Sequence, residues 1–462
     1  CLDAFSTAFI QACDEKGWYT STSQLQLASL QFCILCRSRP TLRLRVEHDA
    51  STRLWAADEA RTDAFQATPA KRLCSTRVPP PAWAHVLKWN VPASMLTSAS
   101  STLARAECLI FGEKVLDSVD DVAWPLGLKE LEFGARFDHP IEHVSWPASL
   151  RWLMFGDGFN QRIDRVAWPA SLRVLTFAAG FNQRIDKVTW PASLQQLTFA
   201  WCFVGSSMGS FDQPIVGITW PSSLLKLTLG GDFNQPIDGA AWPASLLELT
   251  LGDQFNHPIV GVAWPALLEQ LTLGDWFSHP IDEVKWPVSL QVLVLGNEFD
   301  QPIDEVAWPV SLRKLSFGRE FNRPIDGVAW PASLRELTFG LCFDQPIHGS
   351  MLPPFVRKLA VSDIFEGLID GVELPASLEH LSLDCDYSKS IEDVVWPSSL
   401  LRITLDGGFN QCIDHVVWPD SLQQLTFAGY EFNHPIDEVG WPASLQQLVL
   451  GGCFNQPIHR VA

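Results

Sequence analysis

The residues best suited to chemistry in this 462-residue chain are carboxylates that recur at one position of a repeated phrase. In stacked copies these carboxylates would lie about 5 Å apart, where like charges repel. The row therefore either caps free N–H groups of its own turns or collects hard cations such as Ca²⁺. We favour capping, because the row lacks the Gly-rich phrasing of a calcium loop. The aspartates are Asp164, Asp186, Asp238, Asp282, Asp304, Asp326, Asp370, Asp414 and Asp437.

Other candidate metal ligands are too few at any one place. His257 and His279 occupy the same position in adjacent copies, where most copies carry Gln. Two imidazoles without a third ligand make a poor zinc site, so we expect Gln-like hydrogen bonds. Cys33 and Cys36 form a lone C-x-x-C in an apolar setting, which is typical of core thiols. The sequence therefore predicts no metal site.

Catalytic signatures are also missing from the sequence. It has no Gly-rich phosphate loop after a strand and no H-E-x-x-H. Asp, His and Ser are plentiful only at fixed repeat positions, which produces ladders rather than converging triads. We expect a protein that is not an enzyme and that needs no cofactor.

Composition narrows the class of partner. The formal net charge is -19, which argues against a general nucleic-acid binder because phosphates are neutralised by Lys and Arg. No run reaches about 18 apolar residues, so we expect no membrane segment. The eleven cysteines do not pair at stacking positions, which favours a reduced, intracellular protein. The sequence begins at Cys1 rather than Met, so we expect a fragment.

The elements that must position these residues are copies of one 22-residue phrase. The copy that opens at Trp330 reads W-P-A-S-L-R-E-L-T-F-G-L-C-F-D-Q-P-I. The step between copies is 22 residues except at an 8-residue insertion within 202–210 and at one added residue after Trp418. A fixed period of this length is typical of solenoids. Fifteen copies open at Trp124, Trp146, Trp168, Trp190, Trp220, Trp242, Trp264, Trp286, Trp308, Trp330, Leu352, Leu374, Trp396, Trp418 and Trp441.

This spacing predicts one short strand in each copy. Leu337 and Phe339 alternate with Glu336 and Thr338, so one face of the strand is buried, and Gly340 ends it. The two prolines of the phrase disfavour a helix on the return path. One copy cannot bury its own apolar face, so the copies must stack. We predict a leucine-rich-repeat-like solenoid with a curved parallel β-sheet on its concave face and an extended or 3₁₀ convex side.

Three regions follow from this division. Residues 1–78 do not repeat and are predicted to be partly helical, with a helix over 51–66. Residues 79–123 contain degenerate copies that would form an N-terminal cap. Residues 124–462 form the solenoid, which is truncated at its C-terminal end.

The phrase F-N-Q-P-I, as at 233–237 and 454–458, follows the lead-in S-L-x-x-L-x-F/L-G and resembles the FNIP repeat family. The resemblance covers roughly residues 102–462, about three quarters of the chain. It implies a leucine-rich-repeat-like solenoid, protein–protein interaction and no assigned enzymatic activity. This chain carries W-P where family members usually have L-P, and only Leu352 and Leu374 revert.

The outward positions of the predicted strands point to the function. One row is nearly uniform Thr, which alternatively suits a structural or ice-binding plane. The other row varies, and a variable row on a fixed frame is how a repeat protein encodes partner choice. We predict that a protein ligand binds there, with Trp152 and Met154 as an apolar anchor. The charged and polar members are Lys226, Glu248, Gln270, Lys314, Glu336, Lys358, His380 and Arg402.

A basic spot interrupts the acidic sequence. Arg162, Arg165, Arg184 and Lys187 replace the proline and the small or acidic residues of other copies. We expect a solvated patch or a contact with an acidic partner.

An alternative to the scaffold is that this chain is the substrate-recognition part of a larger protein, such as an F-box adaptor or kinase fusion, whose effector domain is absent here.

Overall fold

Two compact units make up the chain, of which the first comprises Cys1–Gln183 with Val188–Leu194 and the second Arg184–Lys187 with Gln195–Ala462. The computed structural model describes residues 45–49, 54–55, 86–90, 106–112, 118–200, 210–345, 351–363, 374–385, 391–392, 394–429 and 431–456. None of these described residues lies in an α-helix. The parallel pairing of successive strands confirms the predicted leucine-rich-repeat-like solenoid.

The first unit contains seven strands among its described residues. From β3 onward each strand pairs in parallel with the next, and paired residues lie 22 positions apart, as in Leu109, Leu131 and Leu153. The helix predicted over 51–66 is wrong at Leu54–Trp55, because these residues pair antiparallel with β1. The rest of that helix lies outside the described residues. The strands are β1 Arg45–Asp49, β2 Leu54–Trp55, β3 Val86–Asn90, β4 Cys108–Phe111, β5 Glu130–Glu132, β6 Trp152–Phe155 and β7 Val174–Phe177.

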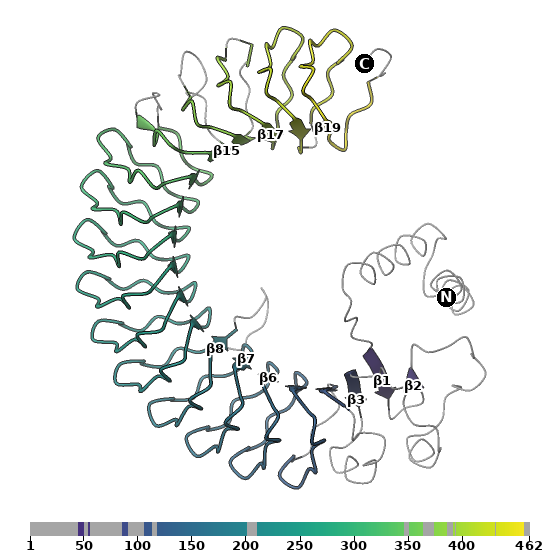
Figure 1. Cartoon of the computed structure of the whole chain (residues 1–462), viewed down its shortest axis with the longest axis vertical. Coiled ribbons are helices and arrows are strands. Elements are labelled where there is room, and N and C mark those ends of the chain that lie inside the picture. Colours follow the sequence, from purple (N-terminus) through teal and green to yellow (C-terminus); the bar gives the residue numbers. More distant parts are fainter. Residues whose placement is uncertain are drawn as a thin grey trace. The chain divides into compact units, whose positions relative to one another are not determined.

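The second unit forms one continuous parallel sheet from β8 to β19. Neighbouring strands pair in the register set by the repeat, as at Leu227, Leu249 and Leu271. Within this unit the strands lie on the inner side of the coils (Figure 1). The strands are β8 Gln196–Phe199, β9 Lys226–Thr228, β10 Glu248–Thr250, β11 Gln270–Thr272, β12 Val292–Val294, β13 Lys314–Ser316, β14 Glu336–Thr338, β15 Lys358–Asp363, β16 His380–Cys385, β17 Arg402–Asp406, β18 Gln424–Phe427 and β19 Gln447–Val449.

Stacked apolar side chains form the core of each unit. The Leu of every strand between β4 and β7, and between β8 and β14, is fully buried. A second row of phenyl rings stacks from coil to coil: Phe277 lies 6.2 Å from Phe255 and 6.1 Å from Phe299, centroid to centroid. Each ring is thus covered only when both neighbouring coils are present, which makes the fold a cooperative stack.

Two side-chain ladders also join the coils. The serine of the W-P-A-S phrase donates its hydroxyl to a Leu carbonyl in the preceding coil, as Ser245 does to Leu224 at 2.6 Å. The residue after the coil Phe accepts a backbone N–H from the same position in the next coil, as Asn234 Oδ1 does from Asn256 at 3.0 Å. These bonds give the Asn row a structural role, since they satisfy turn groups that the sheet cannot reach.

Candidate partner-binding surface

The candidate metal ligands do not form a metal site in the described part of the chain. No group of three or more His, Cys, Asp or Glu side chains there is placed to hold an ion. His257 and His279 each direct Nε2 at an Asn carbonyl of the preceding coil, at 2.9 and 3.1 Å. This confirms the expected Gln-like role, because Gln345 likewise donates to Asn322 of the coil before it.

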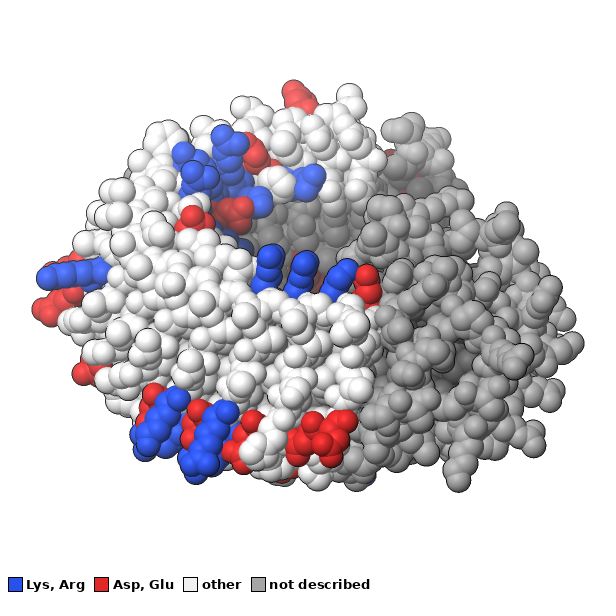
Figure 2. Space-filling model, turned by 60° about the horizontal axis from the view of Figure 1, so that its bottom comes forward, with Lys and Arg blue, Asp and Glu red and all other residues white. Residues whose placement is uncertain are grey.

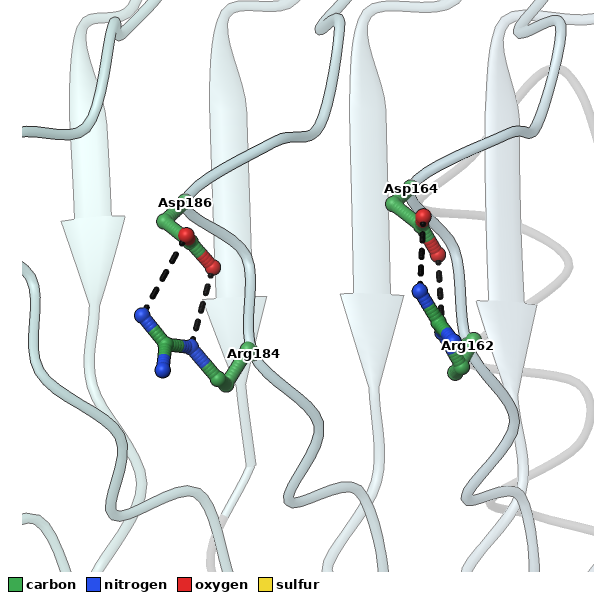
Figure 3. Close-up of polar contacts among 4 residues, drawn as sticks. All are labelled: Arg162, Asp164, Arg184 and Asp186. Atoms are coloured by element: carbon green, nitrogen blue, oxygen red, sulfur yellow. Dashed lines mark hydrogen bonds and ion pairs between the residues drawn. The ribbon is translucent and has the colours of Figure 1, made fainter.

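Two members of the Asp row are held by arginines of their own coil (Figure 3). In the first unit, Arg162 donates from Nε and Nη2 to the two carboxylate oxygens of Asp164, at 3.1 and 3.0 Å. These hydrogen bonds are the largest cause of a lowered Asp164 pKa, which partial burial opposes. In the second unit, Arg184 makes the same contact with Asp186, and the pKa of Asp186 is lowered for the same reason.

The predicted basic spot is consequently weaker than its arginines suggest. Arg162 and Arg184 each form an ion pair with a carboxylate two residues away, although both arginine side chains are largely exposed. Arg165 and Lys187 are exposed in their own units. Each local group keeps a single excess positive charge, so a role in binding an acidic partner stays a prediction for these residues.

The variable row lies on the outward face of the strands, as predicted. Its members pair in register from Lys226 to Arg402 along β9 to β17. Several of them also pair by charge: Lys226 reaches Glu248 at 2.8 Å, and Lys358 reaches Glu336 at 2.7 Å. Such exposed pairs contribute little to stability. They do hold the long side chains in defined positions on the sheet.

Three further members of the row complete this face. Gln270 is exposed on β11. Lys314 lies 4.0 Å from Glu336, which therefore lies between two lysines of neighbouring coils. Burial lowers the pKa of His380, and the cations Arg402 and Lys358 beside it lower the pKa further. His380 is thus favoured in its neutral form on a positively charged part of the sheet.

The predicted apolar anchor lies on β6 of the first unit. Trp152 and Met154 are half-buried and point away from the core, whereas Leu153 and Phe155 between and beside them are fully buried. Met154 pairs in register with Glu132 of β5. The two apolar side chains therefore stand on the outward face of one strand, as an anchor requires.

The Thr row is less regular than an ice-binding plane needs. In the second unit Thr250 and Thr272 are in register, but the next positions are Val294 and Ser316. Ala360 replaces the hydroxyl altogether on β15. These breaks make the Thr row shorter and less regular than a flat plane of repeated hydroxyl groups.

An arginine row escaped the sequence reasoning. One arginine immediately precedes each of β13, β14 and β15, namely Arg313, Arg335 and Arg357. The backbone N–H of Arg335 donates to the Arg313 carbonyl, and that of Arg357 to the Arg335 carbonyl, both at 2.8 Å. The sequence contained the signal, because the three arginines are spaced by 22 residues. The three arginines lie one position before the strands, outside the alternating rows from which binding positions were predicted.

The partly buried carboxyl of Asp253 is expected to make the stability of the second unit depend on pH. Burial raises the pKa of Asp253 to about 6, with further contributions from the negative charges of Asp275 and Asp232. A carboxyl whose pKa is higher in the folded state than in the unfolded state destabilises the fold when it is ionised. The destabilisation is complete at pH values above the folded pKa and is absent at pH values below the unfolded pKa.

We therefore expect Asp253→Asn to stabilise the protein at pH 8, by about 1 kcal/mol after allowing for solvent screening. The gain should shrink as the pH falls through 6 and vanish near pH 4, because the wild-type carboxyl is then protonated. Thermal melts of both proteins across this range would measure it. An equal gain at pH 4 and pH 8 would contradict the electrostatic cause.

Comparison with known proteins agrees with this architecture. The family model described as FNIP Repeat matches residues 125–158, 211–254, 299–342 and 409–453. A solved structure described as CroV588, a novel circular leucine-rich-repeat protein, is 36% identical with a TM-score of 0.65. The match covers 82% of this chain and 58% of that one, so this chain spans less than two thirds of that protein. No curated protein matches the sequence.

A more distant solved structure shares only the fold with this chain. A chain of the Drosophila Toll–Spätzle complex is 13% identical with a TM-score of 0.50, and the match covers 84% of this chain and 65% of that one. Within the described residues, no helix is long and apolar enough to cross a membrane.

Proposed function

Because this chain is built of FNIP repeats in a leucine-rich-repeat-like solenoid, we propose that it is a non-enzymatic scaffold that binds a protein ligand along the outward face of its strands. The observation that carries the proposal is the contrast between two rows on one sheet. Leu and Phe positions repeat almost without change beneath the sheet, whereas the exposed row changes from coil to coil. A rigid frame with variable exposed side chains supports selective recognition of an extended partner surface.

The geometry supports such a role in two ways. The backbone of the strands is fully paired, so an incoming protein meets side chains rather than free N–H and C=O groups. The ion pairs Lys226–Glu248 and Glu336–Lys358 fix long side chains before binding, which lowers the entropy lost on association.

Quantitative binding to a partner captured on the 462-residue chain tests this proposal. Trp152→Ala/Met154→Ala and Lys226→Ser/Glu248→Ser alter the outward face without changing net charge. At least one of them should weaken the affinity about 30-fold or more, as loss of a buried hot spot does. Leu126→Ala is the matched apolar control, since Leu126 is 94% exposed in the turn before β5.

Circular dichroism and thermal melts must first establish that every variant folds. A partner that binds both outward-face variants as tightly as the wild type would contradict binding along the strands. Loss of binding by Leu126→Ala alone would assign recognition to the turns instead.

A further inference from the structure

The second unit carries a concentrated basic surface on an otherwise acidic protein. We define the β13–β17 basic surface as the two positions that open each of these five strands, the residue before the strand and its first residue. Six of the ten side chains are basic and two are acidic. In Figure 2 Lys and Arg side chains gather in a few groups on the viewed face rather than spreading evenly. The basic members are Arg313, Lys314, Arg335, Arg357, Lys358 and Arg402.

The arginines of this surface are held by the fold. The backbone N–H of Arg335 donates to the Arg313 carbonyl and that of Arg357 to the Arg335 carbonyl, both at 2.8 Å. The guanidinium of Arg335 also donates from Nη1 to the carbonyls of Ala332 and Leu334, at 2.7 and 2.9 Å. The backbone positions of Arg313, Arg335 and Arg357 thus follow the strand spacing, roughly 5 Å, along one line.

An exposed aromatic ring stands beside this line. The guanidinium carbon of Arg335 lies 5.7 Å from the centre of the Phe355 ring. Phe355 is 52% exposed although it is a large apolar side chain. Stacking on the ring orients the guanidinium and leaves an apolar contact for the body of a peptide.

The acidic residues within the surface leave most of its charge unbalanced. Glu336 bridges Lys358 and Lys314, at 2.7 and 4.0 Å, and Glu379 pairs with Arg357 at 3.1 Å. Arg313 and Arg402 are exposed at the two ends. With six cations and two carboxylates the surface keeps a positive excess, which is greatest at β13 and β15.

We propose that the β13–β17 basic surface binds an extended, Asp- and Glu-rich segment of the partner protein. Guanidinium groups bind carboxylates through paired hydrogen bonds, and a row of them selects a chain that carries several carboxylates. Five strands span about 20 Å, the length of about six extended residues. This inference rests on the proposed function and names the chemistry of the partner.

A carboxylate-rich peptide fits the surface better than a nucleic acid. Glu336 and Glu379 lie among the basic side chains, and a continuous phosphate backbone would face both of them. A peptide can place a polar or basic residue at those points. The net charge of -19 also opposes the approach of a long polyanion, whereas a short segment is attracted locally.

The first unit supplies a matched control at the same position of its own repeats. Lys129, Arg151 and Arg173 directly precede β5, β6 and β7. Lys129 pairs with Glu107 at 2.8 Å, and the first residue of β5 is Glu130. This row lacks the additional lysines of β13–β17, so it should bind an acidic segment far less well.

Fluorescence anisotropy with a labelled twelve-residue peptide of alternating Glu and Ser tests the inference on the full chain at about 50 mM NaCl. Arg313→Ser/Arg335→Ser/Arg357→Ser should weaken binding about tenfold or more. Lys129→Ser/Arg151→Ser/Arg173→Ser removes the same charge and should change it less than about twofold. Arg313→Ser/Arg357→Ser keeps the Arg335 contacts and provides a second variant if the triple variant unfolds.

Equal weakening by the two triple variants would overturn the inference, because it would show a response to net charge alone. A twelve-nucleotide single strand that bound the arginine row as tightly as the peptide would overturn the assigned occupant. If Arg313→Ser/Arg335→Ser/Arg357→Ser binds the peptide as tightly as the wild type, while the outward-face variants still bind a captured partner more weakly, the inference fails and the proposed function stands. If neither the peptide affinity nor the partner affinity changes, both the inference and the proposed function are contradicted.

Discussion

Replacing Gly296 by alanine should destabilise the second unit by at least about 3 kcal/mol, beyond the range in which neighbouring side chains can adjust. Gly296 follows β12 and lies against the same glycine position of the preceding coil. A Cβ there would overlap the carbonyl oxygen of Gly274 and lie 2.7 Å from its carbonyl carbon. Because both atoms belong to the backbone, only separation of the two coils would make room.

Chemical denaturation and limited proteolysis would measure the effect of Gly296→Ala, the latter because a repeat protein can open locally. Cleavage should appear near β11 to β13 before the rest of the unit. Gly440→Ala is the control, since nothing lies within 4 Å of the added methyl. Similar stability of Gly296→Ala and Gly440→Ala would contradict the tight stacking of the coils.

Truncating Phe277 to alanine is the second large change, with an expected cost of about 3–5 kcal/mol. Its ring is fully buried and stacks between Phe255 and Phe299, at interplanar angles of 7° and 2°. The substitution leaves a cavity between three coils and removes two aromatic contacts at once. Equilibrium denaturation of the whole chain would give the loss.

Trp276→Ala is the matched control for Phe277→Ala, because it removes the neighbouring aromatic residue of the same coil. Trp276 is 55% exposed, so its loss should cost far less. If both alanine variants lost the same stability, the ladder of coil Phe residues would not be the main support of the stack.

The repeat made most of the fold predictable from the sequence. A 22-residue step fixes which residues of neighbouring coils are opposite each other, and Leu–x–Phe alternation fixes which face is buried. The structural role of His257 was also predictable, because it occupies the position at which most copies carry Gln. The strand at Leu54–Trp55 lies outside the repeat, where periodicity gives no guidance.

The candidate site was less predictable, because it depends on contacts that differ between copies. Arg162 looked like a binding residue, yet it bonds to Asp164 in its own coil. Arg335 looked like an ordinary surface residue, yet two backbone carbonyls and Phe355 hold it. Pairwise side-chain geometry decides these roles, and one sequence gives the spacing of residues but not their rotamers.

Photo-crosslinking from single positions tests the central claim, that a partner lies along the outward face of the strands. A benzophenone side chain is introduced at Gln270, which is exposed on β11, or at Val288, which is 75% exposed in the turn before β12. A partner-dependent crosslink is expected from Gln270 and none from Val288. A crosslink from Val288 alone would contradict it.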